Sequence, residues 1–183
     1  MNKEYLISMM RNCKQFENQS VYDHCVSVQD IFKKIWDETT KYPVPEWFVA
    51  EFNFIKSRLI SYEDILEYTL FHDVGKPFCI NYENNIRHFP NHAEISYQIY
   101  SKVSNNKDVL HCIRNDMKIH TIKDAEISKF IDKYSATFVF VGFCELFANA
   151  KYFGGYDSES YKIKFKQLNR RGKKIINILK SKA

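Results

Sequence analysis

The sequence predicts an all-α fold, built as a bundle of helices. Most of its apolar residues recur at spacings of three and four, which is the period of an amphipathic helix. The 183 residues include only 5 Gly and 4 Pro, whereas 45% of the chain is hydrophobic and 16% is aromatic. A composition with few helix breakers and many core-forming side chains is typical of a folded helical protein and argues against disorder.

The chain is long enough to form one compact domain. A chain of 183 residues and 21.8 kDa buries most of the apolar surface that it exposes when unfolded. Neither an internal repeat nor a low-complexity tract interrupts it. We therefore expect one domain over residues 1–183, with a core over roughly residues 20–155 and a basic C-terminal helix over residues 157–183.

The first predicted helix covers the segment "SVYDHCVSVQDIFKKIWDETT", residues 20–40. Its apolar residues lie three or four positions apart: Val21, Cys25, Val28, Phe32 and Trp36. Ser20 is placed to cap this helix, and His24 lies next to the apolar stripe, so its side chain is expected to lean toward the interior. Pro43 and Pro45 break the helix, because proline lacks the amide hydrogen and restricts its neighbour.

The second predicted helix covers "SYEDILEYTLFHDVG", residues 61–75. Its periodicity places His72 and Asp73 in the last turn, and Gly75 and Pro77 are the residues expected to stop it. The chain would then turn away and leave the terminal side chains facing a cleft.

Further helices are expected downstream. Residues 79–90 form a polar loop or a hairpin, and a helix begins around Asn91. A short helix runs through Asp116, and another covers "AEISKFIDKYS", residues 125–135. The segment 136–155 is so rich in β-branched and aromatic residues that periodicity alone also fits a strand. We favour a buried helix there because the flanking segments are helical.

The cysteines and the hydropathy pattern favour a cytoplasmic protein. The 5 cysteines are an odd number without CxxC spacing, which argues against a disulfide framework or a thiolate zinc site. The N-terminus lacks the apolar core of a signal peptide, and no stretch approaches the length of apolar sequence that crosses a membrane. We expect reduced thiols and no membrane partner.

Positive charge gathers near the C-terminus. The formal net charge is +5, and the last segment carries these basic residues: Lys162, Lys164, Lys166, Arg170, Arg171, Lys173, Lys174, Lys180 and Lys182. Such a pattern permits contact with a phosphate-bearing small molecule or with RNA or DNA. A solvated basic face on a final helix explains the same pattern equally well.

Histidines and an aspartate on or beside the predicted helices suggest a metal site. His24, His72, Asp73 and His92 all fall on segments that should pack into one bundle. Adjacent helical residues point about 100° apart, so the His72–Asp73 pair can straddle an ion at the helix edge. Imidazole and carboxylate groups suit a divalent ion such as Mn, Ni, Co, Fe, Zn or Mg, and a shell with open positions favours hydrolysis. Capping or surface hydrogen bonding is the plainer use of a His-Asp pair.

These motifs resemble those of a known family. The run "HDVGKP" at residues 72–77, the isolated His24 upstream and "RHFPNHAEIS" at residues 87–96 together resemble the HD-domain superfamily of metal-dependent phosphohydrolases. Within that superfamily they look most like the HD domain of tRNA nucleotidyltransferases and poly(A) polymerases. The resemblance covers roughly residues 20–155 and implies an HD-domain helical bundle.

The resemblance implies a set of metal ligands. His24 matches the first histidine of the family pattern, and His72 with Asp73 match the HD doublet that binds the ion. The family commonly completes the set with an aspartate on a late helix, where this chain has Asn149, a neutral and weaker ligand. Related domains commonly carry a histidine where this chain has Asp116, and the aspartate is itself able to bind or bridge a metal.

Other matched positions imply catalytic and substrate-binding roles. His92 matches a histidine that binds a second metal or contacts phosphate, and Lys76 matches a lysine whose ammonium would neutralise phosphate charge. His120 lies four residues after Asp116, on the same face if that helix continues, and is a stand-in for the missing histidine. His92 or His120 would protonate the leaving oxygen. Two further candidates for phosphate contact precede His92 in the chain: Arg87 and His88.

Taken with the resemblance, these features predict an enzyme that hydrolyses a phosphoester or phosphoanhydride with a divalent ion. The implied substrate class is a nucleotide, a cyclic phosphate or an oligonucleotide. The chain has no Walker loop and no Rossmann glycine signature, so a glycine-rich phosphate cradle is not indicated. The alternative is a catalytically degenerate HD module that binds nucleic acid or a protein partner, and the loss of the late aspartate fits that alternative.

Overall fold

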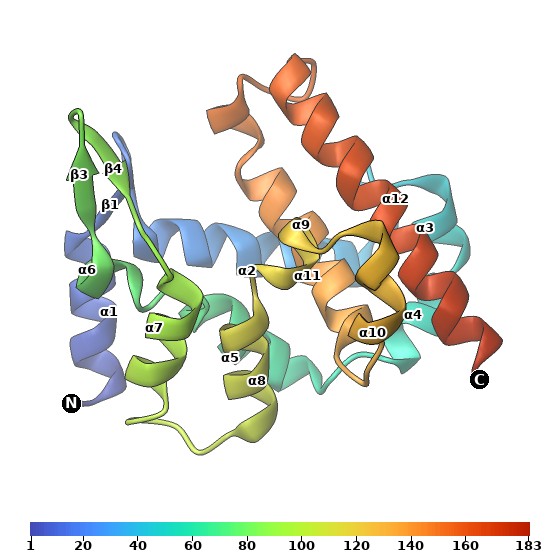
Figure 1. Cartoon of the computed structure of the whole chain (residues 1–183), viewed down its shortest axis with the longest axis horizontal. Coiled ribbons are helices and arrows are strands. Elements are labelled where there is room, and N and C mark those ends of the chain that lie inside the picture. Colours follow the sequence, from blue (N-terminus) through green and yellow to red (C-terminus); the bar gives the residue numbers. More distant parts are fainter. The chain divides into compact units, whose positions relative to one another are not determined.

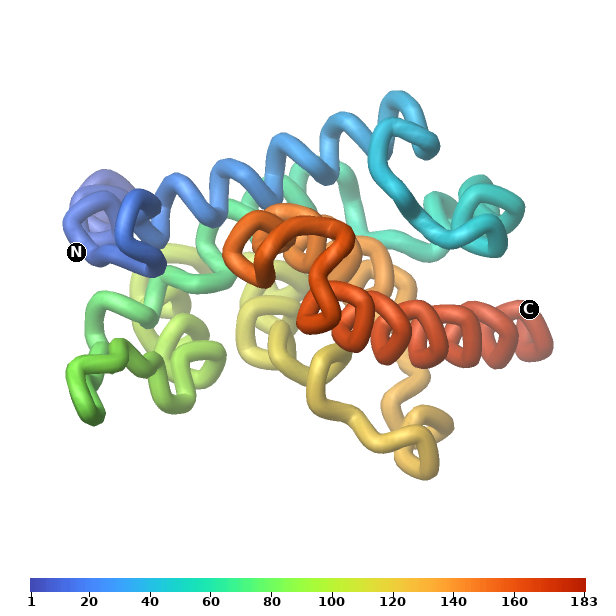
Figure 2. Tube along the Cα trace, turned by 90° about the horizontal axis from the view of Figure 1, so that it is seen from above, coloured from blue at the N-terminus to red at the C-terminus, as the bar shows by residue number.

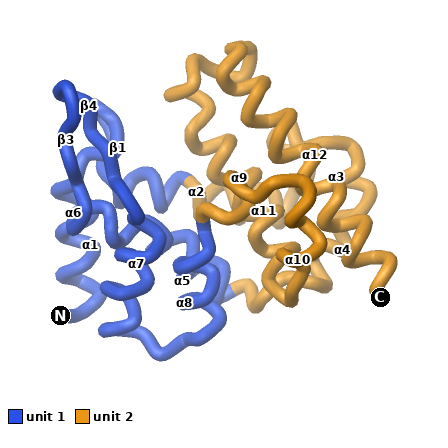
Figure 3. The backbone as a smooth tube through the Cα atoms, in the orientation of Figure 1, with its two compact units in different colours: residues 1–27, 63–116 blue, residues 28–62, 117–183 orange.

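The computed structural model describes all residues, 1–183, and its fold is all-α, as the sequence predicts. Strands form only two short antiparallel hairpins, and helices make up the rest of the regular structure (Figure 1). The chain divides into two compact units, which Figure 3 distinguishes by colour. Unit 1 contains residues 1–27 and 63–116, and unit 2 contains residues 28–62 and 117–183. The single domain expected from the chain length stays a prediction.

Unit 1 combines helices with both hairpins. Its elements are α1 (Lys3–Asn12), β1 (Lys14–Phe16), β2 (Gln19–Ser20), the start of α2 (Val21–Asp37), nearly all of α5 (Tyr62–Phe71), α6 (Lys76–Cys79), β3 (Asn81–Glu83), β4 (Ile86–His88), α7 (His92–Tyr100) and α8 (Lys107–Asn115).

Unit 2 is entirely helical and contains the rest of α2 together with nine further helices. They are η1 (Thr39–Lys41), α3 (Glu46–Ala50), α4 (Phe52–Ser57), α9 (Lys118–Thr121), η2 (Asp124–Glu126), α10 (Ile127–Phe130), α11 (Ser135–Ala148), η3 (Ala150–Phe153) and α12 (Glu159–Ser181), where η denotes a 3₁₀ helix. The helix α12 is the longest of the chain (Figure 2). None of the helices combines the length and the hydropathy that crossing a membrane requires.

The start of α2 follows the sequence prediction closely. The hydroxyl of Ser20 accepts a hydrogen bond from the backbone amide of Asp23 at 3.1 Å, and the carboxylate of Asp23 accepts one from the backbone amide of Ser20 at 3.1 Å. This reciprocal capping satisfies amides that the first helical turn leaves without a partner. It fixes the first turns of α2, and with them His24.

The end of α5 differs from the prediction in a detail that matters for the site. The helix ends at Phe71, so His72 and Asp73 lie in the turn that follows it and not in its last turn. A proline stop is also wrong, because Pro77 is the second residue of a new helix, α6. Proline is well suited to the first turn of a helix, where its missing amide hydrogen costs nothing.

Gly75 is required for close packing and not for a left-handed turn. Its φ is −78°, an ordinary helical value, but a Cβ at this position would lie 2.3 Å from the backbone nitrogen of Ser96 in α7. The backbone amide of Gly75 donates to the hydroxyl of Ser96 at 2.9 Å. The glycine therefore holds the turn after α5 directly against α7.

The polar segment after α6 forms the predicted hairpin. Its two turn residues, Asn84 and Asn85, have φ values of 51° and 62°. Left-handed residues at both central positions define the turn type that matches the twist of a two-residue hairpin, and asparagine tolerates this conformation. The strands β3 and β4 place Arg87 opposite Tyr82. The predicted helix then begins at His92, with Asn91 as its left-handed N-cap.

The short helix predicted to run through Asp116 is present and ends one residue earlier. The helix α8 ends at Asn115, and a turn at Asp116 and Met117 separates it from α9. Asp116 and His120 would share one helical face only if the helix continued between them, and it does not. The helix expected over residues 125–135 is also shorter, because α10 covers only Ile127–Phe130.

The core of unit 2 is built around α11, which resolves the helix-or-strand ambiguity in favour of a helix. Every residue of α11 is buried. The ring of Phe140 lies 5.1 Å from that of Phe32 and 5.3 Å from that of Phe48, and Phe143 lies 5.5 Å from Phe48. Burying each such ring stabilises the fold by about 1.5–3 kcal/mol. A helix that is apolar all round is typical of a fully buried position.

Candidate metal centre

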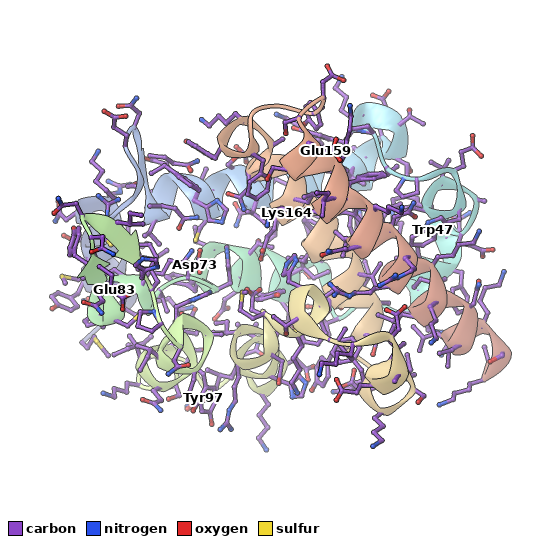
Figure 4. All side chains as sticks on the ribbon, turned by 45° about the horizontal axis from the view of Figure 1, so that its top comes forward. Trp47, Asp73, Glu83, Tyr97, Glu159 and Lys164 are labelled. Atoms are coloured by element: carbon purple, nitrogen blue, oxygen red, sulfur yellow. The ribbon has the colours of Figure 1, made fainter.

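The carboxylate of Asp73 lies among three histidines of unit 1. Asp73 is 2% exposed and lies just past the end of α5 (Figure 4). Its Oδ2 lies 3.3 Å from Nε2 of His72 and 3.6 Å from Nε2 of His24. Its Oδ1 lies 3.7 Å from Nε2 of His92. Residues 48 positions apart in the sequence, such as His24 and His72, thus present nitrogen atoms to one carboxylate.

His24 is held at the site by the way α2 begins. The capping of the first turn fixes the helix, and the apolar stripe that contains Val21, Cys25 and Val28 is completely buried. His24 lies at the edge of this stripe and is itself 2% exposed. The prediction that His24 leans into the interior is therefore confirmed.

His72 is oriented by the backbone of α5. Its Nδ1 lies 2.8 Å from the carbonyl oxygen of Thr69. A carbonyl oxygen only accepts, so Nδ1 carries the hydrogen and donates it. The Nε2 atom, which faces Asp73, is then the ring nitrogen that can exchange a proton for a metal ion.

His92 is oriented in the same way. Its Nδ1 donates to the carbonyl oxygen of Phe89 at 3.0 Å, so its Nε2 is the atom that faces Asp73. His92 is the first residue of α7, and its position follows from the left-handed Asn91 before it. In metal proteins a ligating histidine usually donates its other ring N–H to a carbonyl or carboxylate, which fixes the ring and its tautomer. His72 and His92 both have this arrangement.

Lys76 is the fourth group against Asp73. Its ammonium lies 2.5 Å from Oδ2 of Asp73 and 2.8 Å from Oε1 of Gln15, in β1. It also lies 5.4 Å from the centre of the Phe89 ring. Lysine is rarely as buried as Lys76, which is 9% exposed, unless it is paired. Lys76 is therefore a buried, paired lysine and not a solvated one.

The charges of the site shift two pKa values in opposite directions. Burial raises the pKa of the Asp73 carboxyl, but Lys76 and the neighbouring histidines outweigh it and hold that pKa well below its usual range. Burial lowers the pKa of His72, whereas Cys25 and Asp73 nearby raise it, and the net pKa lies well above the ordinary value. A bound metal ion would replace the proton on Nε2 of His72, since only the deprotonated nitrogen is a ligand.

The donor set fits a divalent ion. The ligand atoms of His24, His72 and Asp73 all lie within 4.8 Å of one another. Two ligands that are each about 2.1 Å from an ion lie about 3.0–3.5 Å apart in tetrahedral or octahedral geometry, and the two separations to Asp73 Oδ2 are 3.3 and 3.6 Å. Two imidazoles and one carboxylate match the ligand preference of first-row transition ions and leave coordination positions open.

Arg87 and His88, the predicted phosphate contacts, lie on β4 of the hairpin. Arg87 is half-buried, and its guanidinium donates to the backbone carbonyl of Lys14 at 2.5 Å. It also lies 5.9 Å from the ring centre of Tyr82. The guanidinium thus ties β4 to β1, whereas the His88 side chain is exposed. Their roles in substrate binding stay predictions.

Asp116 lies in unit 1 but outside the three-ligand group. It is 2% exposed, and its Oδ1 accepts a hydrogen bond from the hydroxyl of Tyr68 at 2.5 Å. The ring of Tyr68 in turn lies 6.4 Å from that of His72. Asp116 is therefore linked through one side chain to the HD doublet.

His120 and Asn149 lie in unit 2. Nε2 of His120 lies 3.3 Å from Oε2 of Glu145, which is almost wholly buried in α11. Asn149 follows the last residue of α11, and its Oδ1 is buried without a hydrogen-bond partner. The predicted roles of His120 as an acid and of Asn149 as a ligand stay predictions.

Sequence reasoning missed several groups that build the site. Gln15 accepts a hydrogen bond from Lys76, which lies 61 positions further along the chain. Gln15 belongs to the β1–β2 hairpin, whose turn has no recognisable sequence signal. The backbone carbonyls that orient His72 and His92 carry no side-chain signature. Outside the site, Glu145 of unit 2, the partner of His120, was detectable in principle, because it is the one charged residue in the apolar segment of α11.

A comparison with protein-family models agrees with this geometry. Residues 21–137 match the family model of the HD domain, which is most of the chain. The chain therefore belongs to the HD-domain family, whose members are generally hydrolases that bind divalent metal ions. The helical bundle described above is the fold of that family. Searches of curated proteins and of solved structures found no significant match.

Proposed function

We propose that this chain is a metal-dependent phosphohydrolase that acts on a nucleotide, a cyclic phosphate or an oligonucleotide. The observation that carries the proposal is the arrangement around Asp73, where three histidine Nε2 atoms lie 3.3–3.7 Å from its two oxygens. Both oriented histidines keep their hydrogen on Nδ1, as metal ligation through Nε2 requires.

His24, His72 and Asp73 would hold the ion. When bound, a divalent ion in such a shell polarises a phosphoryl oxygen and lowers the pKa of a water molecule toward neutrality. The carboxylate of Asp73 is suited to this task because its pKa is already held low, so it stays ionised over the whole neutral range. Burial of all three side chains excludes competing water from the ligand atoms.

His92 and Lys76 would act on the substrate. Nε2 of His92 points toward the site, and its side chain is 17% exposed, more than those of the other two histidines. A protonated His92 would donate from this nitrogen to the leaving oxygen. If an ion bound to Asp73 displaces the ammonium of Lys76 from the carboxylate, that ammonium would stabilise the negative charge that develops on the phosphoryl group.

A further oxygen ligand would close the shell. We propose Asp116 for this position, because it belongs to unit 1 like the other three ligands, while Asn149 stays the position that the resemblance implies. Asp116 brings a charge and is buried near the doublet in unit 1, whereas Asn149 offers a neutral oxygen that lacks a hydrogen-bond partner. A carboxylate binds a divalent ion more strongly than an amide, so the choice between them sets the metal affinity.

The substrate class follows from the resemblance to the HD domain of tRNA nucleotidyltransferases and poly(A) polymerases. Those domains belong to RNA-processing enzymes, which favours a phosphate attached to a nucleoside. The test is a hydrolysis screen in Mn, Ni, Co or Mg with bis(p-nitrophenyl) phosphate, 2′,3′-cyclic nucleotides and nucleoside mono-, di- and triphosphates. Asp73→Asn should abolish metal-dependent turnover, whereas Asp157→Asn, an exposed aspartate with the same change in charge, should retain it. Full activity in Asp73→Asn would refute the proposal.

One observation favours a second candidate, a degenerate HD module that binds without catalysis. The ammonium of Lys76 already neutralises Asp73, so the buried carboxylate has a cation in the absence of any metal. The missing late aspartate at position 149 points the same way. Under this candidate the protein would hold no metal and would hydrolyse none of the substrates in the screen.

A further inference from the structure

The excess positive charge of the protein lies entirely on its last helix. Residues 159–183 contain nine lysines and arginines but only one acid, Glu159. The rest of the chain contains 18 basic and 21 acidic residues, which gives it a net charge of −3. The net charge of +5 is therefore a property of α12 and not of the surface in general.

One face of α12 is fully used in holding unit 2 together. Its buried residues are Tyr161, Leu168, Gly172, Ile175 and Ile176. A Cβ at Gly172 would lie 3.1 Å from Trp47 and 3.1 Å from Val139, so the helix packs closely there. The indole N–H of Trp47 also donates to Oδ1 of Asn169 at 2.5 Å. The apolar face of this amphipathic helix is thus not available for a partner.

The opposite face carries a row of cations, which we call the α12 stripe. Its members are Lys162, Lys166, Arg170, Lys173, Lys174 and Lys180, all exposed. The first four follow one another at spacings of four, four and three, Lys174 lies four positions after Arg170, and Lys180 lies seven after Lys173, so all six share one side of α12. Figure 4 labels Glu159 and Lys164 at the start of the same helix. At a pitch of about 5.4 Å per turn, the stripe offers roughly one cation per turn over about 27 Å.

Half of the α12 stripe is not neutralised. Lys162, Lys166 and Lys173 make no side-chain hydrogen bond or ion pair, whereas Arg170 pairs with Asp124 at 3.1 Å and Lys180 with Glu51 at 2.6 Å. Lys162 lies in the first turn of α12, where the helix dipole disfavours a cation. Packing and pairing within unit 2 therefore do not explain these lysines.

A shallow, open depression of about 410 Å³ lies on the C-terminal half of α12, beside the α12 stripe. Besides the apolar Ile178, its lining consists of cations and uncharged hydrogen-bonding groups: Arg170, Lys173, Lys174, Asn177 and Ser181. Lysine and arginine with asparagine and serine are the side chains that most often contact phosphate oxygens and sugars.

We propose that the α12 stripe binds the phosphate backbone of a nucleic acid. A regular row of cations suits a polymer with regularly spaced phosphates, which lie about 3.4 Å apart along each strand of DNA. A membrane surface fits less well, because a helix that binds lipid buries its apolar face in the bilayer, and α12 uses that face inside unit 2. This binding is independent of hydrolysis at Asp73.

The test is the salt dependence of binding to a fluorescein-labelled single-stranded RNA of twenty nucleotides, followed by fluorescence anisotropy. The full-length chain is used in EDTA, so that metal-dependent hydrolysis plays no part. The test variant is Lys162→Glu/Lys166→Glu/Lys173→Glu, and the control is Lys34→Glu/Lys118→Glu/Lys129→Glu. The control lysines are also exposed and give the same change in net charge. Circular dichroism checks that each variant is folded.

The stripe variant should lose at least tenfold in affinity at 50 mM KCl, and the control about threefold or less. The slope of log K against log salt should become shallower by about 2 in the stripe variant, since each phosphate contact on a single strand contributes about 0.7. The proposal is overturned if the wild type does not bind RNA, or if both triple variants lose affinity equally. Binding to phosphatidylserine vesicles without binding to RNA would overturn it as well.

Discussion

The ammonium of Lys76 lies 2.5 Å from Oδ2 of Asp73, on the carboxylate oxygen that also faces His24 and His72. The lysine therefore occupies the side of Asp73 on which an ion would bind. A buried carboxylate needs a counter-charge, and a lysine and a metal ion are alternative ways to provide it. Lys76 and a metal ion should therefore compete for the carboxylate of Asp73.

Replacing Lys76 with methionine should lower the free energy of unfolding of the metal-free protein and should make the protein bind metal more tightly. Removing one partner of a buried ion pair costs about 3–5 kcal/mol, because the other charge stays buried. The loss of a nearby like charge should also lower the Kd for Mn by about tenfold, or about 1.4 kcal/mol. Thermal denaturation with and without Mn, together with calorimetric titration, measures both effects. Lys102→Met, at an exposed lysine, is the control, and an unchanged Kd in Lys76→Met would contradict the competition.

Restoring the late carboxylate should tighten metal binding if position 149 closes the shell. Asn149→Asp places a charge where Oδ1 is now buried without a hydrogen-bond partner. A carboxylate is the stronger ligand, so the Kd for Mn should fall about tenfold or more. The matched variant Asp116→Asn tests the other candidate and should raise the Kd if Asp116 is the ligand. Calorimetric titration of both variants distinguishes the two positions.

Gly75→Ala should disrupt the turn that carries the HD doublet. The new Cβ would lie 2.3 Å from one backbone atom and 2.8 Å from others in α7, and backbone cannot move aside as a flexible side chain can. We expect a loss of about 3 kcal/mol in the free energy of unfolding, measured by urea denaturation. Gly155→Ala is the contrast, because its Cβ meets no atom within 4 Å and only its φ of +89° is unfavourable. That variant should lose about 1 kcal/mol, and an equal loss in both would contradict the packing argument.

Glu67 should make the protein sensitive to acid. Burial raises the pKa of this carboxyl, but hydrogen bonds from Tyr100, Lys3 and Ser104 outweigh it, so the pKa of Glu67 is lowered on folding. A lowered pKa contributes stability above the unfolded value of about 4.3, and this contribution is lost as the pH falls through the folded value.

Glu67→Gln tests that contribution. The variant should lose about 1–2 kcal/mol in unfolding free energy at pH 7, since hydrogen bonds to a charged group are worth about that much. Its deficit relative to the wild type should shrink as the pH falls below about 4. Urea denaturation at pH 7, 5 and 3.5 gives the profile, with the exposed Glu63→Gln as the control. A deficit that stays constant with pH would contradict the account.

The sequence predicted the residues of the candidate metal centre better than it predicted their surroundings. The resemblance to the HD-domain family selected His24, His72 and Asp73, since a His-Asp pair alone has the plainer uses of capping and surface hydrogen bonding. The structure brings the ligand atoms of these three residues within 4.8 Å of one another. Gln15 was not predictable, because its contact with the site depends on a hairpin that pairs Lys14 with Ser20 without a recognisable turn sequence.

The helices show the same contrast between features that the local sequence determines and features that distant contacts determine. The apolar period predicted α2 and α5, whereas α11 was assigned from its helical flanks because the period alone also fits a strand. The break between α8 and α9 at Asp116 carries neither glycine nor proline. Tertiary contacts determine where such a break occurs, and the spacing of apolar residues in the sequence carries no information about these contacts. Gly75 was assigned the wrong role for a related reason: a close approach to α7 looks the same in sequence as a helix stop.

The metal content of the purified protein shows whether Asp73 and its histidines form a metal centre. The full-length protein is stripped with a chelator, reconstituted with a mixture of Mn, Ni, Co, Fe and Zn, dialysed and analysed by mass spectrometry. We expect about one equivalent of metal in the wild type and in the exposed-site control Asp157→Asn, and almost none in His72→Ala or Asp73→Asn. A wild type without metal, or a His72→Ala variant that retains it, would contradict the assignment of Asp73 and its histidines as a metal centre.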